Sequence, residues 1–234
     1  MNIFKKLRTH NRKRRLCIPE YARLAYSQEG EDMVIERILG SKNNGFFIDV
    51  GAHHPSRFSN TRYFYDKGWC GINIDPLPGA MQLFNKERPR DTNIEGGIAE
   101  KDGRLTYYMF NESALNTFSE EEATKKDGLR GEYRIIEKRV IAVQRLDELL
   151  HEIGIKDKTI DFISVDAEGL DLGILKSNDW NLFRPTIVLA EALNSSMAKL
   201  ITDPVVEYMD SQGFYPVAKT YNTVFFKDSR LESR

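Results

Sequence analysis

GFFIDVGAHHPS, residues 45–56, is the stretch of the chain that decides the fold. Its first half is apolar apart from Asp49, and Gly51 ends the apolar run. Short apolar runs bounded by glycine are typical of buried parallel strands. His53 and His54 follow where such a strand would end. An acid, a glycine and two imidazoles at this place indicate a ligand-binding loop, a metal site or an ordinary strand end.

The next segments repeat the strand pattern with a helix between. CGINIDP, residues 70–76, is a second short apolar run. SNTRYFYDKG, residues 59–68, offers Ser59 as a helix cap, an aromatic run and a glycine stop. Strand, helix and strand at this spacing predict a βαβ unit, whose two strands are parallel and buried.

The alternation continues to the end of the chain. Further helices are expected within residues 26–40 (capped by Ser27), 78–87, 170–180 and 203–213, and in the second half of 139–154. Further strands are expected within residues 92–100, 104–110, 160–169 and 185–193, at the start of 139–154, and as a hairpin over 214–228. Residues 111–139 are polar and indicate an insertion or a lid. Together, these helices and strands predict a doubly wound α/β fold with a mostly parallel sheet and a terminal antiparallel hairpin.

Length and composition limit the class of protein. The chain has 234 residues, of which 41% are hydrophobic and 29% charged, which suits one globular domain over residues 25–234 after a tail over residues 1–24. With 34 Lys and Arg against 35 Asp and Glu, the net charge is close to zero, so it does not indicate a nucleic-acid partner. The two cysteines fit no zinc or disulfide pattern. We expect a cytoplasmic protein, because neither a spanning run nor a signal peptide is evident.

The N-terminal tail is locally basic. KKLRTHNRKRR, residues 5–15, contains seven Lys and Arg and no acid. A solvated tail is one interpretation. The other is a reversible, salt-sensitive contact with an anionic membrane surface, to which clustered cations are attracted.

Acidic residues follow several of the expected strands. Asp49 and Asp75 belong to the first two, Asp166 and Glu168 follow the strand FISV, and Glu191 follows TIVLA. Since ligands of doubly wound sheets bind beyond the carboxyl ends of the strands, these acids predict a binding site at that edge. Asp75 is placed along the chain roughly where a Rossmann-like site holds the carboxylate for a ribose diol. The loop after Gly51 lacks the glycines that a dinucleotide needs, which favours a nucleoside ligand without a pyrophosphate.

Taken together, FFIDVGAHHP, GINIDP and IDFISVDAEGLDLGIL, preceded by YSQEGED, resemble the FkbM family of S-adenosylmethionine-dependent methyltransferases. The resemblance covers roughly residues 25–195. It implies the class I methyltransferase fold with a seven-stranded sheet, and O-methylation of a hydroxyl on a sugar, a glycan (polysaccharide modification) or a natural product. It also implies that Asp49 and Gly51 border the methionine part of the cofactor, that Asp75 binds the ribose and that Ile98 lies near the adenine. Gln28, Pro76 and Asp166 complete the implied cofactor site.

Candidates for the chemistry lie beside the same strand ends. Asp166, His53 and Glu168 are candidates to accept the hydroxyl proton of the acceptor or to orient it. A weaker alternative places a divalent cation among Asp166, Glu191 and His54, although metal is not expected. The acceptor segment that varies in the family corresponds to 111–139. Two other functions stay open, an N-methyltransferase acting on an amine or amide, and a nucleoside-binding protein without turnover.

Overall fold

The computed structural model describes residues 19–40, 42–192 and 196–231. The basic segment 5–15, for which a membrane contact was one interpretation, lies outside the described residues. Within the described ranges, no helix has both the length and the apolar character that crossing a membrane requires.

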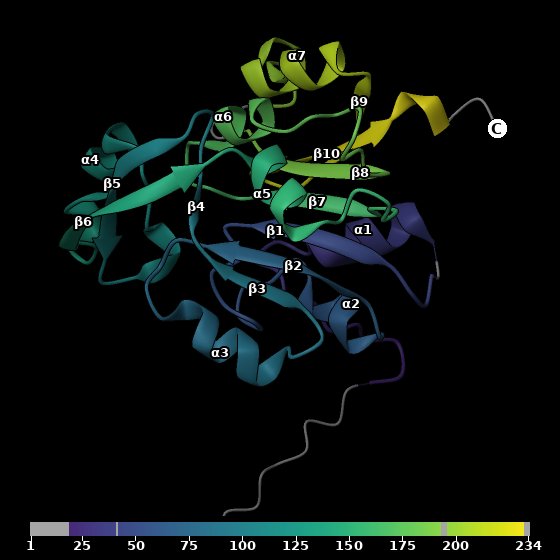
Figure 1. Cartoon of the computed structure of the whole chain (residues 1–234), viewed down its shortest axis with the longest axis horizontal. Coiled ribbons are helices and arrows are strands. Elements are labelled where there is room, and N and C mark those ends of the chain that lie inside the picture. The colour runs from purple at the N-terminus through teal and green to yellow at the C-terminus, as the bar shows by residue number, and fades with distance from the viewer. Residues whose placement is uncertain (1–18, 41, 193–195, 232–234) are drawn as a thin grey trace, which may run out of the picture.

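A seven-stranded sheet forms the centre of the molecule, with the strand order β3-β2-β1-β7-β8-β10-β9 (Figure 1). Its strands are β1 (Phe46–Val50), β2 (Cys70–Asp75), β3 (Thr92–Glu95), β7 (Phe162–Val165), β8 (Ile187–Glu191), β9 (Phe214–Lys219) and β10 (Thr223–Asp228). The five strands from β3 to β8 run parallel, and β10 is antiparallel to both β8 and β9. The expected doubly wound sheet with its terminal hairpin is confirmed.

Helices cover both faces of this sheet. They are α1 (Glu31–Leu39), α2 (Arg62–Asp66), α3 (Ala80–Glu87), α5 (Leu146–Ile153), α6 (Asp171–Lys176) and α7 (Pro204–Ser211). On one face, α5, α6 and α7 bury apolar side chains against alternate strand positions such as Ile48 and Val165. On the other face, Ile35 of α1 and Phe64 of α2 pack against Phe47 and Phe162. Successive strand residues point to opposite faces, so continuously apolar strands supply both cores.

Two helices begin later than the cap positions suggest. Helix α1 begins after Gly30, which adopts the left-handed conformation with φ of 88°. Ser27 is therefore not its cap residue, although its hydroxyl accepts a hydrogen bond from the Asp32 amide at 3.3 Å. Helix α2 likewise begins after Thr61, while the Ser59 hydroxyl accepts from the Arg62 amide at 3.1 Å. Both serines satisfy a free amide of the first turn from outside the helix.

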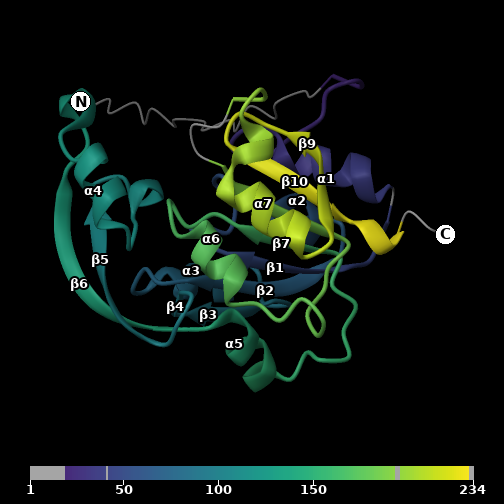
Figure 2. The same cartoon turned by 90° about the horizontal axis from the view of Figure 1, so that it is seen from above.

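The expected weak strand over residues 92–100 divides into two strands that belong to different sheets. Strand β3 stays in the main sheet, whereas β4 (Gly97–Ile98) begins a three-stranded sheet with the order β4-β6-β5. This second sheet contains β5 (Gly103–Phe110) and β6 (Ile135–Gln144), which project from the main body as a long curved hairpin (Figure 2).

Residues 111–139, expected as an insertion or lid, connect and complete that hairpin. They contain η1 (Ser113–Leu115), α4 (Glu120–Lys126), η2 (Leu129–Gly131) and the first half of β6. Ala123 of α4 packs with Tyr108 and Phe110 of β5 in a small apolar cluster. The polar composition of the segment agrees with its exposure, since four of the five β6 residues that it contains, 136–139, are exposed.

Candidate active site

The strand ends bring four of the sequence candidates into one row. Val50 of β1 pairs with Ile74 of β2, so Gly51 lies opposite Asp75. Val165 of β7 pairs with Ala190 of β8, so Asp166 lies opposite Glu191. Because β1 and β7 are neighbours, the row across the sheet reads Asp75, Gly51, Asp166, Glu191. The carboxyl edge of the sheet therefore carries three acids and one glycine at successive strands.

A pocket of about 760 Å³, counted with its open mouth, lies over this row. Eight residues expected from the sequence line it, namely Gln28, Gly51, His53, Asp75, Pro76, Ile98, Asp166 and Glu168. The opposite wall comes from β5 and the segment that follows it, with Tyr107, Asn116 and Phe118 among its residues. The pocket is thus enclosed between the two sheets.

Asp75 is held in one orientation by two backbone amides. One carboxylate oxygen accepts from the His53 amide and the other from the Leu77 amide, both at 2.8 Å. Each oxygen keeps a further lone pair for a ligand. Burial raises the pKa of Asp75 to about 6, in spite of these two hydrogen bonds. The side chain is therefore a fixed acceptor that loses its charge in mild acid.

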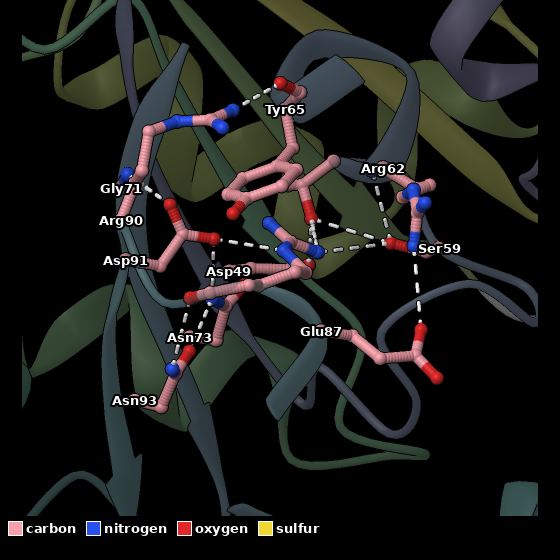
Figure 3. A network of polar contacts seen from close by, with 12 residues as sticks. Asp49, Ser59, Arg62, Tyr65, Gly71, Asn73, Glu87, Arg90, Asp91 and Asn93 are labelled. Carbon is pink, nitrogen blue, oxygen red and sulfur yellow. Dashed lines mark hydrogen bonds and ion pairs between the residues drawn. The ribbon is translucent and has the colours of Figure 1, made fainter. Parts of the chain in front are cut away.

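Asp49 lies outside the pocket, in contrast to its expected place beside the methionine part of a cofactor. Figure 3 shows it within a network of polar contacts that includes Ser59 and Asp91. Its carboxylate accepts a hydrogen bond from the Thr61 hydroxyl at 2.9 Å, and Thr61 accepts one from Arg88 at 2.9 Å. Arg88 also forms a fully buried ion pair with Asp91 at 2.7 Å. Strand alternation explains the placement, because Val50 faces the pocket and its neighbour Asp49 points the other way.

Three carboxyl groups gather at the other end of the pocket and in the recess beside it. Asp166 is exposed where it faces the pocket, and desolvation of its carboxyl group, followed by the charge of the nearby Glu168, raises its pKa well above the ordinary range. Burial and the charge of Asp166 likewise raise the pKa of Glu191, whose Oε2 is buried without a hydrogen-bond partner. Glu168 is bound by Lys126 of α4. Proton affinity is therefore concentrated on Asp166 and Glu191.

Residues 49–215 match the model of the methyltransferase FkbM domain. The chain belongs to the FkbM methyltransferase family. Among solved structures, a methyltransferase FkbM from Methylobacillus flagellatus KT is similar at 15% identity with a TM-score of 0.48, over 79% of this chain and 44% of that one. This chain thus spans less than half of that protein. No curated protein sequence matches it.

His53 lines the pocket of this FkbM-family domain, and its Nε2 is buried without a partner. Burial, followed by the charge of Arg57, lowers the pKa of His53 to about 4. The imidazole is therefore neutral at physiological pH, and a group with so low a pKa is a weak general base. His53 can offer a hydrogen bond to a ligand, while its backbone amide orients Asp75.

His54, the weaker metal candidate, has a local structural contact. Its Nδ1 accepts hydrogen bonds from the amides of Ser56 and Arg57 at 3.0 and 2.9 Å. It does not line the recess where Asp166 and Glu191 meet. Across the residues that the structure describes, no three His, Cys, Asp or Glu side chains are grouped as a metal site requires.

The FkbM-family sequence motifs did not indicate the wall that the second sheet supplies. The Thr117 hydroxyl donates to the Glu168 carbonyl at 2.9 Å, which ties this wall to the loop after β7. Asn116 accepts from the Phe110 amide at 2.7 Å, which fixes the turn that carries the wall. The available sequence signal was the apolar Phe118 within an otherwise polar stretch, since such a residue needs a buried surface.

Proposed function

We propose that this chain is an S-adenosylmethionine-dependent O-methyltransferase that acts on a hydroxyl of a sugar, glycan or natural product. The observation that supports it best is the single pocket that runs from the oriented carboxylate of Asp75, past the backbone of Gly51, to the high-pKa carboxyl of Asp166. The family supplies methyl transfer, and this pocket supplies both an acceptor for a ribose and a base for a hydroxyl.

The residues present fit the cofactor. The free lone pairs of Asp75 suit the two hydroxyls of a ribose, and Pro76 and Ile98 offer apolar contacts for an adenine ring. Gln28 and the backbone at Gly51 would hold the methionine part. The pocket is lined by three carboxyl groups and by no Lys or Arg among the described residues, which favours a ligand that carries a sulfonium cation.

The bound cofactor would supply the electrophilic methyl group, and the chain would orient the acceptor and manage the proton. Asp166 is the residue that we assign to receive the hydroxyl proton. Its raised pKa suits that task, because a carboxylate with a greater proton affinity is a stronger base. Glu168 contributes by its charge, which raises the proton affinity of Asp166. His53, neutral and lacking a partner at Nε2, can hydrogen-bond the acceptor.

The test is an incubation of the purified chain with S-adenosylmethionine labelled in its methyl group and with a panel of hydroxyl and amine acceptors. We expect label on oxygen and one S-adenosylhomocysteine per methylated product. Label on nitrogen alone would replace the proposal by an N-methyltransferase. Tight cofactor binding without transfer to any acceptor would favour a nucleoside-binding protein.

A further inference from the structure

A second, smaller recess adjoins the pocket on the side of strand β8. Its lining includes Glu29, Glu31, Asp166 and Glu191, and we call it the acidic recess. It shares Asp166 with the main pocket, so a molecule beside Asp166 reaches both. Its place is the far end of the row of strand ends, one strand beyond Asp166.

The four carboxylates of the acidic recess are not equally satisfied. Glu31 accepts hydrogen bonds from the Glu29 amide at 2.9 Å and from the Thr220 hydroxyl at 2.8 Å. Glu29 accepts from the Asn222 amide at 3.1 Å. Glu191 differs, because its buried Oε2 has no partner among the described residues. A buried carboxylate oxygen without a donor costs free energy, and a ligand that donates to it would recover that cost.

The recess also lacks a balancing cation. No Lys or Arg is among the described residues that line it or the main pocket. Lys126 is the nearby cation, and its ammonium group is bound to Glu168. The charge of Asp166 consequently raises the proton affinity of Glu191, and the charge of Glu168 raises that of Asp166. Two adjacent carboxyl groups of this kind are relieved by a shared proton or by a bound cation.

We propose that the acidic recess binds a protonated amine of the acceptor between Glu191 and Asp166, so that the acceptor is an amine-bearing hydroxyl compound of the amino-sugar type. This inference rests on the proposed function and deepens it by naming the substrate class. An ammonium group donates three hydrogen bonds and brings the charge that the recess lacks. Acceptors that carry phosphate or carboxylate groups are disfavoured by the same charges.

Position separates this recess from the cofactor's ribose. Asp75 ends β2 and Glu191 ends β8, with β1 and β7 between them. Adjacent strands are about 4.8 Å apart, so the two carboxylates are separated by roughly 14 Å along the edge. A cofactor anchored at Asp75 fills the first part of this distance, and the acceptor must approach from the remaining side. The acidic recess is on that side.

The experiment measures the binding of glucosamine and of glucose to the full chain saturated with S-adenosylhomocysteine, by ligand-observed NMR titration near neutral pH. We expect glucosamine to bind about tenfold or more tightly than glucose, the effect of a charge-assisted hydrogen bond. Glu191→Gln keeps the shape and removes the charge, so the preference should disappear. Glu207→Gln, an exposed glutamate of α7, is the matched control and should keep it.

Three outcomes would overturn the inference. The first is equal affinity for the two sugars, and the second is a preference for glucosamine that survives Glu191→Gln. The third is displacement of glucosamine by S-adenosylhomocysteine, because that result would assign the recess to the amino-acid part of the cofactor. If Glu191→Gln does not fold, Asp166→Asn replaces it and should also abolish the preference for glucosamine over glucose. Failure of the proposed function can be distinguished from failure of this inference. If only the proposed function is wrong, S-adenosylhomocysteine does not bind, while the preference for glucosamine over glucose, and with it the amine site, persists.

Discussion

A Cβ atom placed on Gly51 would lie 1.8 Å from the backbone carbonyl oxygen of Asp166. The two loops that follow β1 and β7 therefore touch backbone to backbone in the floor of the candidate site. Gly51 also has φ of +83°, a conformation that side chains disfavour. The position of Asp166 thus depends on the absence of a side chain at residue 51.

Gly51→Ala should consequently lower stability and disturb the pocket. The added methyl group must displace the Asp166 carbonyl and adds strain at positive φ, which together cost on the order of 1–3 kcal/mol or more. Urea denaturation measures the loss. Gly103→Ala is the matched control, because a Cβ there meets nothing within 4 Å. If both variants unfold at the same urea concentration as the parent, the close approach of Gly51 to Asp166 does not contribute to the free energy of unfolding.

Asp166→Asn should reduce turnover while leaving cofactor affinity nearly unchanged. Asparagine keeps the shape but cannot take up the acceptor proton, so the rate should fall roughly 10²-fold or more. Methyl transfer and S-adenosylhomocysteine affinity are measured on the same preparation, with the exposed Asp210→Asn as the control. Full activity in the Asp166→Asn protein would exclude the base. Activity that EDTA abolishes and Mg²⁺ restores would favour a metal role instead.

Cofactor affinity should depend on pH through Asp75. Its pKa of about 6 in the ligand-free protein means that the carboxylate is charged above this pH and protonated below it. Since the charged form is the better acceptor for two ribose hydroxyls, S-adenosylhomocysteine affinity should be constant above about pH 7 and fall as the pH drops through 6. Calorimetry across this range measures the effect. Asp75→Asn should bind weakly at every pH, and an equally steep fall in that variant would assign the titration to another group.

The buried network around Arg88 should govern stability rather than binding. Arg88→Met leaves the carboxylate of Asp91 buried without its partner, which typically costs about 3–5 kcal/mol. Arg139→Met breaks an exposed ion pair with Glu137 and should cost under about 1 kcal/mol. Denaturation of both variants gives the comparison. Asp49→Asn adds a separate test, because loss of cofactor affinity at unchanged stability would return Asp49 to the binding site.

The strand ends were predictable because their pattern is local. An apolar run that stops at Gly51 or before Asp166 marks the end of a buried parallel strand, and parallel strands end at a common edge. The resemblance to the family then implies cofactor-binding roles for those positions. Asp49 could not be placed in this way, because membership in the motif does not determine the face of β1 to which its side chain points.

The remaining wall was not predictable for a different physical reason. Tyr107, Asn116 and Phe118 reach the pocket because β5 pairs with β6 and folds the segment back over Asp166. That pairing joins residues far apart along the chain, and the charged, exposed residues 137–139 conceal the strand character of the first half of β6. The recess at Glu191 was likewise visible only as a strand-end acid, since its missing partner is a property of the packed structure.

Calorimetric titration of S-adenosylhomocysteine into the parent chain and into Asp75→Ala is the decisive measurement for the cofactor pocket. We expect saturable one-to-one binding to the parent and affinity reduced well over tenfold in the variant, because two charge-assisted hydrogen bonds to the ribose are lost. Circular dichroism should show that the variant remains folded. Absence of binding to the parent, or unchanged affinity in a folded Asp75→Ala protein, would contradict the assignment of this pocket to the cofactor.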